Sequence, residues 1–204
     1  MQSLISNLGK PEQRKLLEDL NYLNMGEIKA FCNKHSIPYS IWIETGSGGR
    51  RKTRDNDRKG VILDRIRLYL KTGGILPATC FPLNVVCFDD LPKDIKPTDR
   101  LHYGQYDKNS SAMVGLLEDL TGGQFKNGAV ARILAREFWS KGIAPRLREF
   151  ARAWLKARQN HERPNPEWAF LSDRSEHKHS PNWKQLRIVT AKRVLRILNE
   201  IGNK

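Results

Sequence analysis

Three things are scarce in this sequence: cysteine, acidic residues and long apolar runs. Its 204 residues include only Cys32, Cys80 and Cys87, which have neither the spacing of zinc ligands nor the even, dense pattern of a disulfide framework. No apolar run reaches the length of a membrane-spanning helix, and the N-terminus lacks the regions of a signal peptide. We therefore expect a soluble, unprocessed protein of a reducing cytoplasm that carries no cofactor or metal.

The shortage of acidic residues leaves a large positive charge. The chain has 36 Lys+Arg against 22 Asp+Glu, which gives a formal net charge of +14. A field of this sign favours nucleic acid or an anionic membrane surface as the partner, and the missing apolar run argues against the membrane. The length allows one domain or two small ones, and 39% hydrophobic residues suffice for a packed core.

Two short segments with helical apolar periodicity lie between residues 23 and 74. The first predicts a helix that ends near Ser36, because Pro38 cannot continue it. The second predicts a helix that ends at Gly73 and Gly74. Their apolar stripes are Leu23, Ile28, Phe31 and Cys32 in the first, and Ile62, Ile66, Tyr69 and Leu70 in the second.

Residues 39–58, between these two segments, form a long connection rich in glycine and basic residues. Its charged residues are Arg50, Arg51, Lys52, Arg54 and Arg58, against Glu44, Asp55 and Asp57. Glycine lets a backbone approach phosphate closely, and a helix N-terminus offers unpaired N–H groups to an anion. A loop of this kind suits a polyanion; the alternative interpretation is a disordered, solvated linker.

The residues from Lys59 to Ile66 resemble the start of the second helix of the SAP motif, a helix–extended loop–helix module of many DNA-associated proteins. Here the run reads KGVILDRI, where the family has lysine, a small residue, a variable residue, Leu-Ile, an acid and Arg-Ile. The first helix agrees through Met25, Ile28, Lys29, Phe31 and Ile37. The resemblance covers residues 23–71, and it implies that the loop and the start of the second helix contact the DNA backbone and minor groove. The connection of residues 39–58 is longer than the short turn of the family, which leaves the register of these contacts open.

Residues 75–106 differ in composition from the segments on either side. They contain four prolines, show no helical period, and include one candidate strand at Asn84 to Phe88. Because Phe81, Val85, Val86 and Phe88 are apolar, we expect this mostly irregular segment to lie across a neighbouring domain.

The second half of the sequence predicts a series of helices. They begin at Ser110–Ser111, Asn127, Pro145 and the region of residues 181–183, and the last one ends at Ile201. We therefore predict a mainly α protein with a SAP-like helix–loop–helix module at 1–74, a Pro-rich connection at 75–106 and a basic helical bundle at 107–204. The bundle is also similar to an uncharacterised helical domain that accompanies SAP motifs in some bacterial proteins. In a bacterium the protein would then be nucleoid-associated.

Basic residues recur at helical spacing within this second half. Like charges four residues apart repel each other and destabilise an isolated helix, and a bound polyanion would relieve this repulsion. For any single basic residue, the alternative interpretation is a solvated position on the helix surface. Together with the loop, they complete the predicted DNA-binding residues: Gly48, Gly49, Arg50, Arg51, Lys52, Arg54, Arg58, Lys59, Arg132, Arg136, Arg148, Arg152, Lys156, Lys192, Arg193 and Arg196.

No sequence motif for an enzyme stands out. The chain has no P-loop, dinucleotide fingerprint or deaminase motif, although Asp173, Glu176, His177 and His179 include the residue types of a metal-dependent nuclease. We therefore predict a non-enzymatic protein that binds duplex DNA through its backbone and minor groove. Three alternatives remain open: an RNA-binding protein, an adaptor that binds an acidic protein, and a metal-dependent nuclease.

Overall fold

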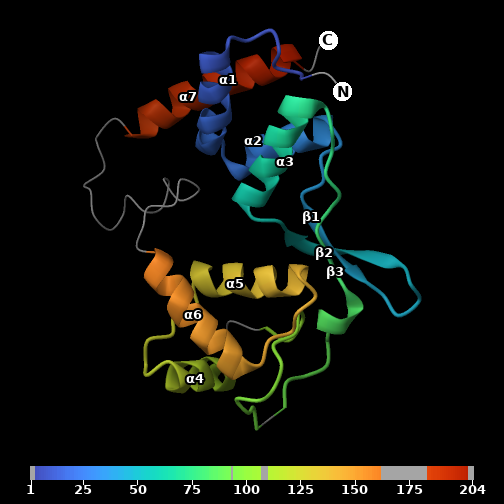
Figure 1. The fold of residues 1–204 in the computed structure, drawn as a ribbon, viewed down its shortest axis with the longest axis vertical. Helices are drawn as coiled ribbons and strands as arrows, with labels where there is room; N and C mark the ends of the chain where they lie inside the picture. Colours follow the sequence, from blue (N-terminus) through green and yellow to red (C-terminus); the bar gives the residue numbers. More distant parts are fainter. Residues whose placement is uncertain (1–2, 93, 107–109, 162–182, 202–204) are drawn as a thin grey trace. The chain divides into compact units, whose positions relative to one another are not determined.

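The computed structural model describes residues 3–92, 94–106, 110–161 and 183–201 (Figure 1). Within these ranges the chain forms seven α-helices, two short 3-10 helices and a three-stranded sheet. The predicted mainly α fold class is therefore wrong, because the fold is mixed α/β.

The sheet arises where the sequence predicted loops. Strands β1 (Ser40–Glu44) and β2 (Arg50–Asn56) form a hairpin, and β3 (Cys80–Phe81) pairs in parallel with β1 so that the strand order is β2-β1-β3. β2 escaped the sequence analysis because it is an exposed edge strand, so its residues RRKTRDN show no alternation of apolar and polar side chains. β3 has only two residues, too few for any periodic signal.

The described chain divides into two compact units, neither of which is continuous in sequence. The terminal unit contains residues 3–40, 55–78 and 183–201, and the central unit contains residues 41–54 and 79–161. This division differs from the predicted boundaries 1–74, 75–106 and 107–204 in two ways. The basic loop belongs mainly to the central unit, and the last helix belongs with the N-terminal helices.

In the terminal unit, the two helices predicted around the basic connection are present as α2 (Met25–Lys34) and α3 (Lys59–Thr72). A capping box starts α2, in which the Asn24 side chain accepts from the Glu27 N–H and the Glu27 carboxylate accepts from the Asn24 N–H. Helix α3 ends at Gly73, whose left-handed φ of 71° lets its N–H donate to the Tyr69 carbonyl. Their facing sides supply much of one core: Ile28, Phe31, Cys32, Ile62, Leu63, Ile66 and Leu70.

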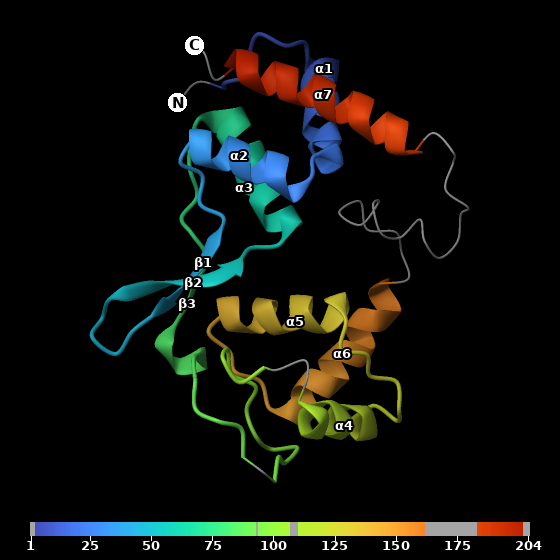
Figure 2. The ribbon, with the colours of Figure 1, turned by 180° about the vertical axis from the view of Figure 1, so that it is seen from behind.

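Two further helices close this core. Helix α1 (Lys10–Asp19) lies in a region to which the sequence analysis assigned no element, and a short 3-10 helix (Leu20–Tyr22) follows it. Helix α7 (Trp183–Ile201) packs beside both, as the two ribbon views show (Figures 1 and 2). Val194 and Leu198 of α7 are buried in this core, where α7 contacts α1 and the 3-10 helix.

The central unit contains three helices, which share one core with Ile41 and Ile43 of β1 and Phe81 of β3. These are α4 (Ser111–Leu120), α5 (Ala129–Ser140) and α6 (Leu147–His161). Trp139 is at the centre of this core, and its indole N–H donates to the Leu101 carbonyl over 2.9 Å. The predicted strand at Asn84 to Phe88 is wrong, because Leu83–Val85 form a 3-10 helix and only Val86 makes a bridge, with Tyr103.

A buried ion pair joins the base of the hairpin to α3. The Arg65 guanidinium lies 2.5 Å from the Asp57 carboxylate and also donates to the Pro38 carbonyl, over 3.0 Å. Both charged side chains are almost completely buried. The Asp57 N–H donates to the Tyr39 carbonyl over 2.8 Å, so the segments before β1 and after β2 are held together at α3.

His35, the residue after α2, lies between two aromatic rings. Its ring centroid is 4.4 Å from that of Phe31 and 5.2 Å from that of Tyr69, whose hydroxyl is 3.0 Å from Nδ1. Nε2 is buried and has no hydrogen-bond partner among the described residues. Burial lowers the pKa of His35, and the positive charge of Lys34 lowers it further.

We expect Asp57→Ala to lower the free energy of unfolding by about 3–5 kcal/mol, because it leaves the buried Arg65 charge without its partner. Asp64→Ala is the control. Asp64 pairs with Arg67 on the surface of α3, and removing this pair should lower the free energy of unfolding by less than about 1 kcal/mol. Urea unfolding followed by circular dichroism measures both. Equal losses in the two variants would contradict a special role for the buried pair.

We also expect a pH-dependent contribution of His35 to stability. Because the folded state lowers the pKa of His35, the unfolded state binds the proton more tightly, and stability falls as the pH drops below the ordinary histidine pKa. Between about pH 7 and pH 5, wild type should lose more stability than His35→Gln. Thermal unfolding of both proteins across this range tests the expectation, and parallel curves would refute it.

Candidate nucleic-acid interface

The loop predicted between the two helices is a tight β-hairpin. Thr45 and Gly48 close its turn, with the Gly48 N–H 3.0 Å from the Thr45 carbonyl, and the Thr45 N–H donates back to the Gly49 carbonyl. Gly48 has a left-handed φ of 74°, the conformation expected after a type I turn in a three-residue hairpin loop. Gly48 is therefore needed for the turn itself, whatever it contacts.

Four basic side chains follow this turn along β2. Arg50, Arg51, Lys52 and Arg54 are all exposed, and residues 45–54 contain no acidic residue. Since side chains alternate along a strand, Arg50, Lys52 and Arg54 share one face of the hairpin. Arg51 and Thr53 take the other face, where the Thr53 hydroxyl donates to the Ile41 carbonyl.

Cys80 on β3 lies within the electrostatic reach of Arg50. Burial raises the pKa of Cys80, while the charge of Arg50 lowers it and that of Glu44 raises it. Arg50 is thus close enough to the sheet for its charge to act on the thiol. The Glu44 carboxylate in turn accepts from the Leu83 N–H over 3.2 Å.

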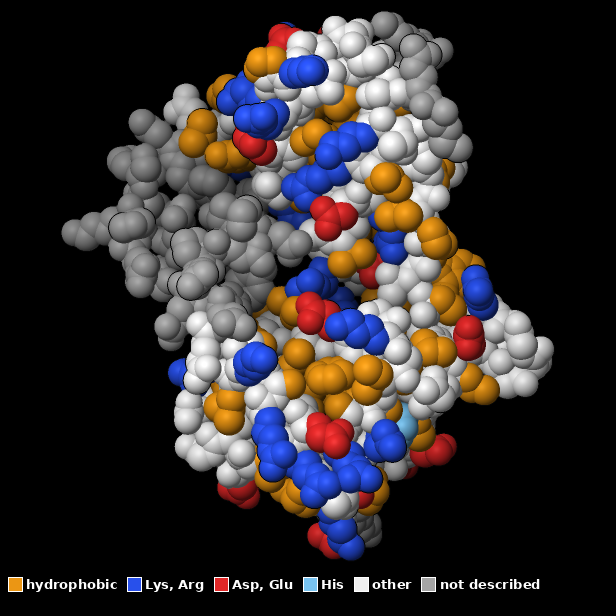
Figure 3. Space-filling model, viewed as in Figure 1, with side chains coloured by type: hydrophobic (Ala, Val, Ile, Leu, Met, Phe, Trp, Pro, Cys, Tyr) orange, Lys and Arg blue, Asp and Glu red, His pale blue; other side chains and the backbone are white. Residues whose placement is uncertain are grey.

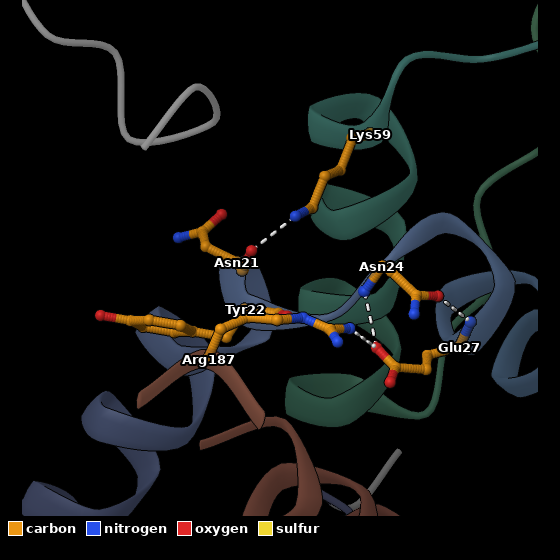
Figure 4. A network of polar contacts seen from close by, with 6 residues as sticks. All are labelled: Asn21, Tyr22, Asn24, Glu27, Lys59 and Arg187. Carbon is orange, nitrogen blue, oxygen red and sulfur yellow. Dashed lines mark hydrogen bonds and ion pairs between the residues drawn. The ribbon is translucent and has the colours of Figure 1, made fainter. Parts of the chain in front are cut away.

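Arg58 and Lys59 are at the start of α3. Arg58 is the N-cap residue, and the first turn has neither a side-chain cap nor an acidic residue. This differs from α2, where Glu27 occupies the first turn and completes the capping box. The Lys59 ammonium, however, donates to the Asn21 carbonyl, so part of its role is structural (Figure 4).

The basic row predicted on α7 divides between two roles. Arg193 forms an ion pair with Asp19, which is buried in the terminal unit, whereas Lys192 and Arg196 are exposed. Arg187 is also used internally: it donates to the Glu27 carboxylate over 2.7 Å and to the Tyr22 carbonyl over 3.2 Å (Figure 4). The arginines at 187 and 193 therefore hold α7 in place and neutralise carboxylates of the terminal unit.

Helix α6 carries an uninterrupted basic row in the central unit. Arg148, Arg152 and Lys156 are exposed at successive spacings of four residues, opposite the buried side of the helix. Two of the predicted DNA-binding residues are on α5: Arg132 is exposed and Arg136 is half-buried. Lys and Arg side chains are visible on the surface over this unit (Figure 3).

One exposed aromatic residue was not predicted as part of the site. Phe88, which the sequence analysis expected to be covered, is 58% exposed, and the Arg51 guanidinium lies 5.2 Å from its ring centroid. Nothing in the sequence signals this contact, because residues 51 and 88 are brought together only by the pairing of β1 with both β2 and β3.

The described residues also bear on metal binding and on membrane insertion. No group of three or more His, Cys, Asp or Glu side chains that could hold a metal ion occurs in them. Asp173, Glu176, His177 and His179 lie outside these residues. Over the same parts of the chain, no helix combines the length and apolarity needed to cross a membrane.

The chain matches no protein-family model, no curated protein and no solved structure. The resemblance to the SAP motif therefore remains a prediction, and the geometry of the basic hairpin is the basis for the functional argument.

Proposed function

We propose that this protein binds duplex DNA without catalysing a reaction on it, and that the β1–β2 hairpin makes the main contact. The observation that carries the proposal is the exposed row of Arg50, Lys52 and Arg54 on the edge strand β2, within a run of residues 45–54 that contains no acid. These cations pair with no carboxylate in the described parts of the chain, so phosphate groups are suitable partners for them.

The shape of the hairpin supports a duplex as the ligand. A two-stranded ribbon is narrow enough to follow a DNA groove, and its cations then lie beside the phosphates of the groove walls. Contacts of this kind position the protein on the backbone and read groove shape more than base identity. We propose backbone and minor-groove contacts, which is also what the SAP resemblance implies for the connection between α2 and α3.

Two other sets of cations support the proposal by adding to the positive field. The first is Arg58 and Lys59 at the start of α3, where the helix dipole also favours an anion. The second is the row Arg148, Arg152 and Lys156 on α6, in the same unit as the hairpin. Most of the affinity would come from the release of counterions from the DNA, so binding would depend steeply on salt.

The proposal predicts that the triple variant Arg50→Ala, Lys52→Ala, Arg54→Ala binds a duplex oligonucleotide at least about tenfold more weakly at low salt. It should also reduce the slope of log Kd against log salt by about two to three, at roughly 0.9 per lost phosphate contact. Fluorescence anisotropy across a salt series measures both quantities.

A matched control removes the same charge elsewhere in the central unit: Arg148→Ala, Arg152→Ala, Lys156→Ala. We expect it to change the slope less than the hairpin variant does, and an equal change would show that the hairpin is not the main contact. Absence of binding to duplex DNA at low salt would refute the proposal altogether. Stronger binding to duplex RNA than to DNA of the same sequence would assign the hairpin to RNA.

A further inference from the structure

Phe88 is an exposed ring at the end of an otherwise buried aromatic cluster. Its centroid is 6.2 Å from that of Tyr103, whose ring in turn lies 5.5 Å from the buried Trp139, both in edge-on arrangements. Leaving a phenylalanine 58% exposed forgoes much of the free energy that its burial would contribute. The ring is thus attached to the core without being part of it.

The backbone around Phe88 holds the ring in a defined position. The Cys87 N–H donates to the Tyr103 carbonyl over 2.9 Å, and the Tyr103 N–H donates to the Val85 carbonyl over 2.8 Å. Gly104 has a left-handed φ of 100°, and a Cβ on it would lie 2.2 Å from the Cys87 carbonyl oxygen and 2.8 Å from Cδ1 of Phe88. Only glycine therefore allows the chain to pass so closely behind the ring.

The basic hairpin places a guanidinium over this ring. Cζ of Arg51 lies 5.2 Å from the Phe88 centroid, which is within cation–π distance. Arg51 projects from the face of β2 opposite to Arg50 and Lys52, and its side chain is exposed. A guanidinium is planar, so a base can stack on the exposed Arg51 group while the Phe88 ring stays within cation–π distance of it.

We propose that Arg51 and Phe88 form a stacking site for an unpaired base of DNA. The inference rests on the proposed function, in which Arg50, Lys52 and Arg54 hold the backbone of the same DNA. Asp89 and Asp90, both exposed, directly follow Phe88 and would repel a phosphate there. A base carries no charge and can stack at this position, so the hairpin would favour duplexes that contain an unpaired or extruded base.

The test compares two duplex oligonucleotides, each with one 2-aminopurine in the middle of one strand. The 2-aminopurine is unpaired in one duplex and paired in the other, and the two duplexes are otherwise the same. Base stacking on side chains contributes about 1–3 kcal/mol, so wild type should bind the duplex with the unpaired base about 5- to 150-fold more tightly than the paired one. Because stacking between neighbouring bases quenches 2-aminopurine, its transfer from the DNA stack onto Arg51 should also raise its fluorescence. Anisotropy gives the two Kd values, and the fluorescence titration reports the base directly.

Arg51→Lys separates stacking from charge. It keeps the positive charge but not the planar group, so affinity for the paired duplex should change less than about threefold while the preference for the unpaired base is lost. Phe88→Ala should lose the same preference, because the guanidinium loses its support. Arg50→Lys is the matched control on the other face of the strand, and it should keep the preference.

Equal affinity of wild type for the two duplexes, with paired DNA still bound, would overturn the stacking site and leave the proposed function standing. A preference that survives in Arg51→Lys would also overturn it. Absence of binding to either duplex would refute both proposals together.

Discussion

The ion pair between Asp57 and Arg65 fixes the two points at which the chain leaves and re-enters the terminal unit. Arg65 contacts the segment before β1 through the Pro38 carbonyl and the segment after β2 through Asp57. A buried charge without its partner costs several kcal/mol, so neither segment can move away from α3 without a large loss of stability. The segments on either side of the hairpin are therefore held together at α3.

Ion pairs also decide which cations are available to a ligand. On α7, Arg187 and Arg193 complete the terminal unit by pairing with Glu27 and Asp19. An arginine in such a pair is already neutralised and held by hydrogen bonds, and its release to a phosphate would break the packing of the helix. The hairpin cations Arg50, Lys52 and Arg54 form none of the ion pairs found among the described residues, so they are available to a ligand.

The helices of the terminal unit show how far periodicity alone can go. The stripes around Ile28 and Ile66 predicted α2 and α3 and much of their shared core, because an amphipathic helix shows its buried face in the local sequence. The sheet could not be predicted in this way. β2 is an edge strand whose stability comes from backbone hydrogen bonds with β1, and such bonds have no side-chain signature.

By itself, the sequence determined the excess of positive charge, the cluster of cations between residues 50 and 54, and the two helices on either side of it. These are properties of composition and of residues a few positions apart. Only the tertiary structure decided that this cluster lies on a hairpin, that Arg193 of α7 pairs with Asp19, and that Arg51 lies over Phe88. The last two outcomes depend on contacts between residues 174 and 37 positions apart in the chain. Backbone pairing and the burial of charge select such contacts over the whole molecule, and no local pattern encodes them.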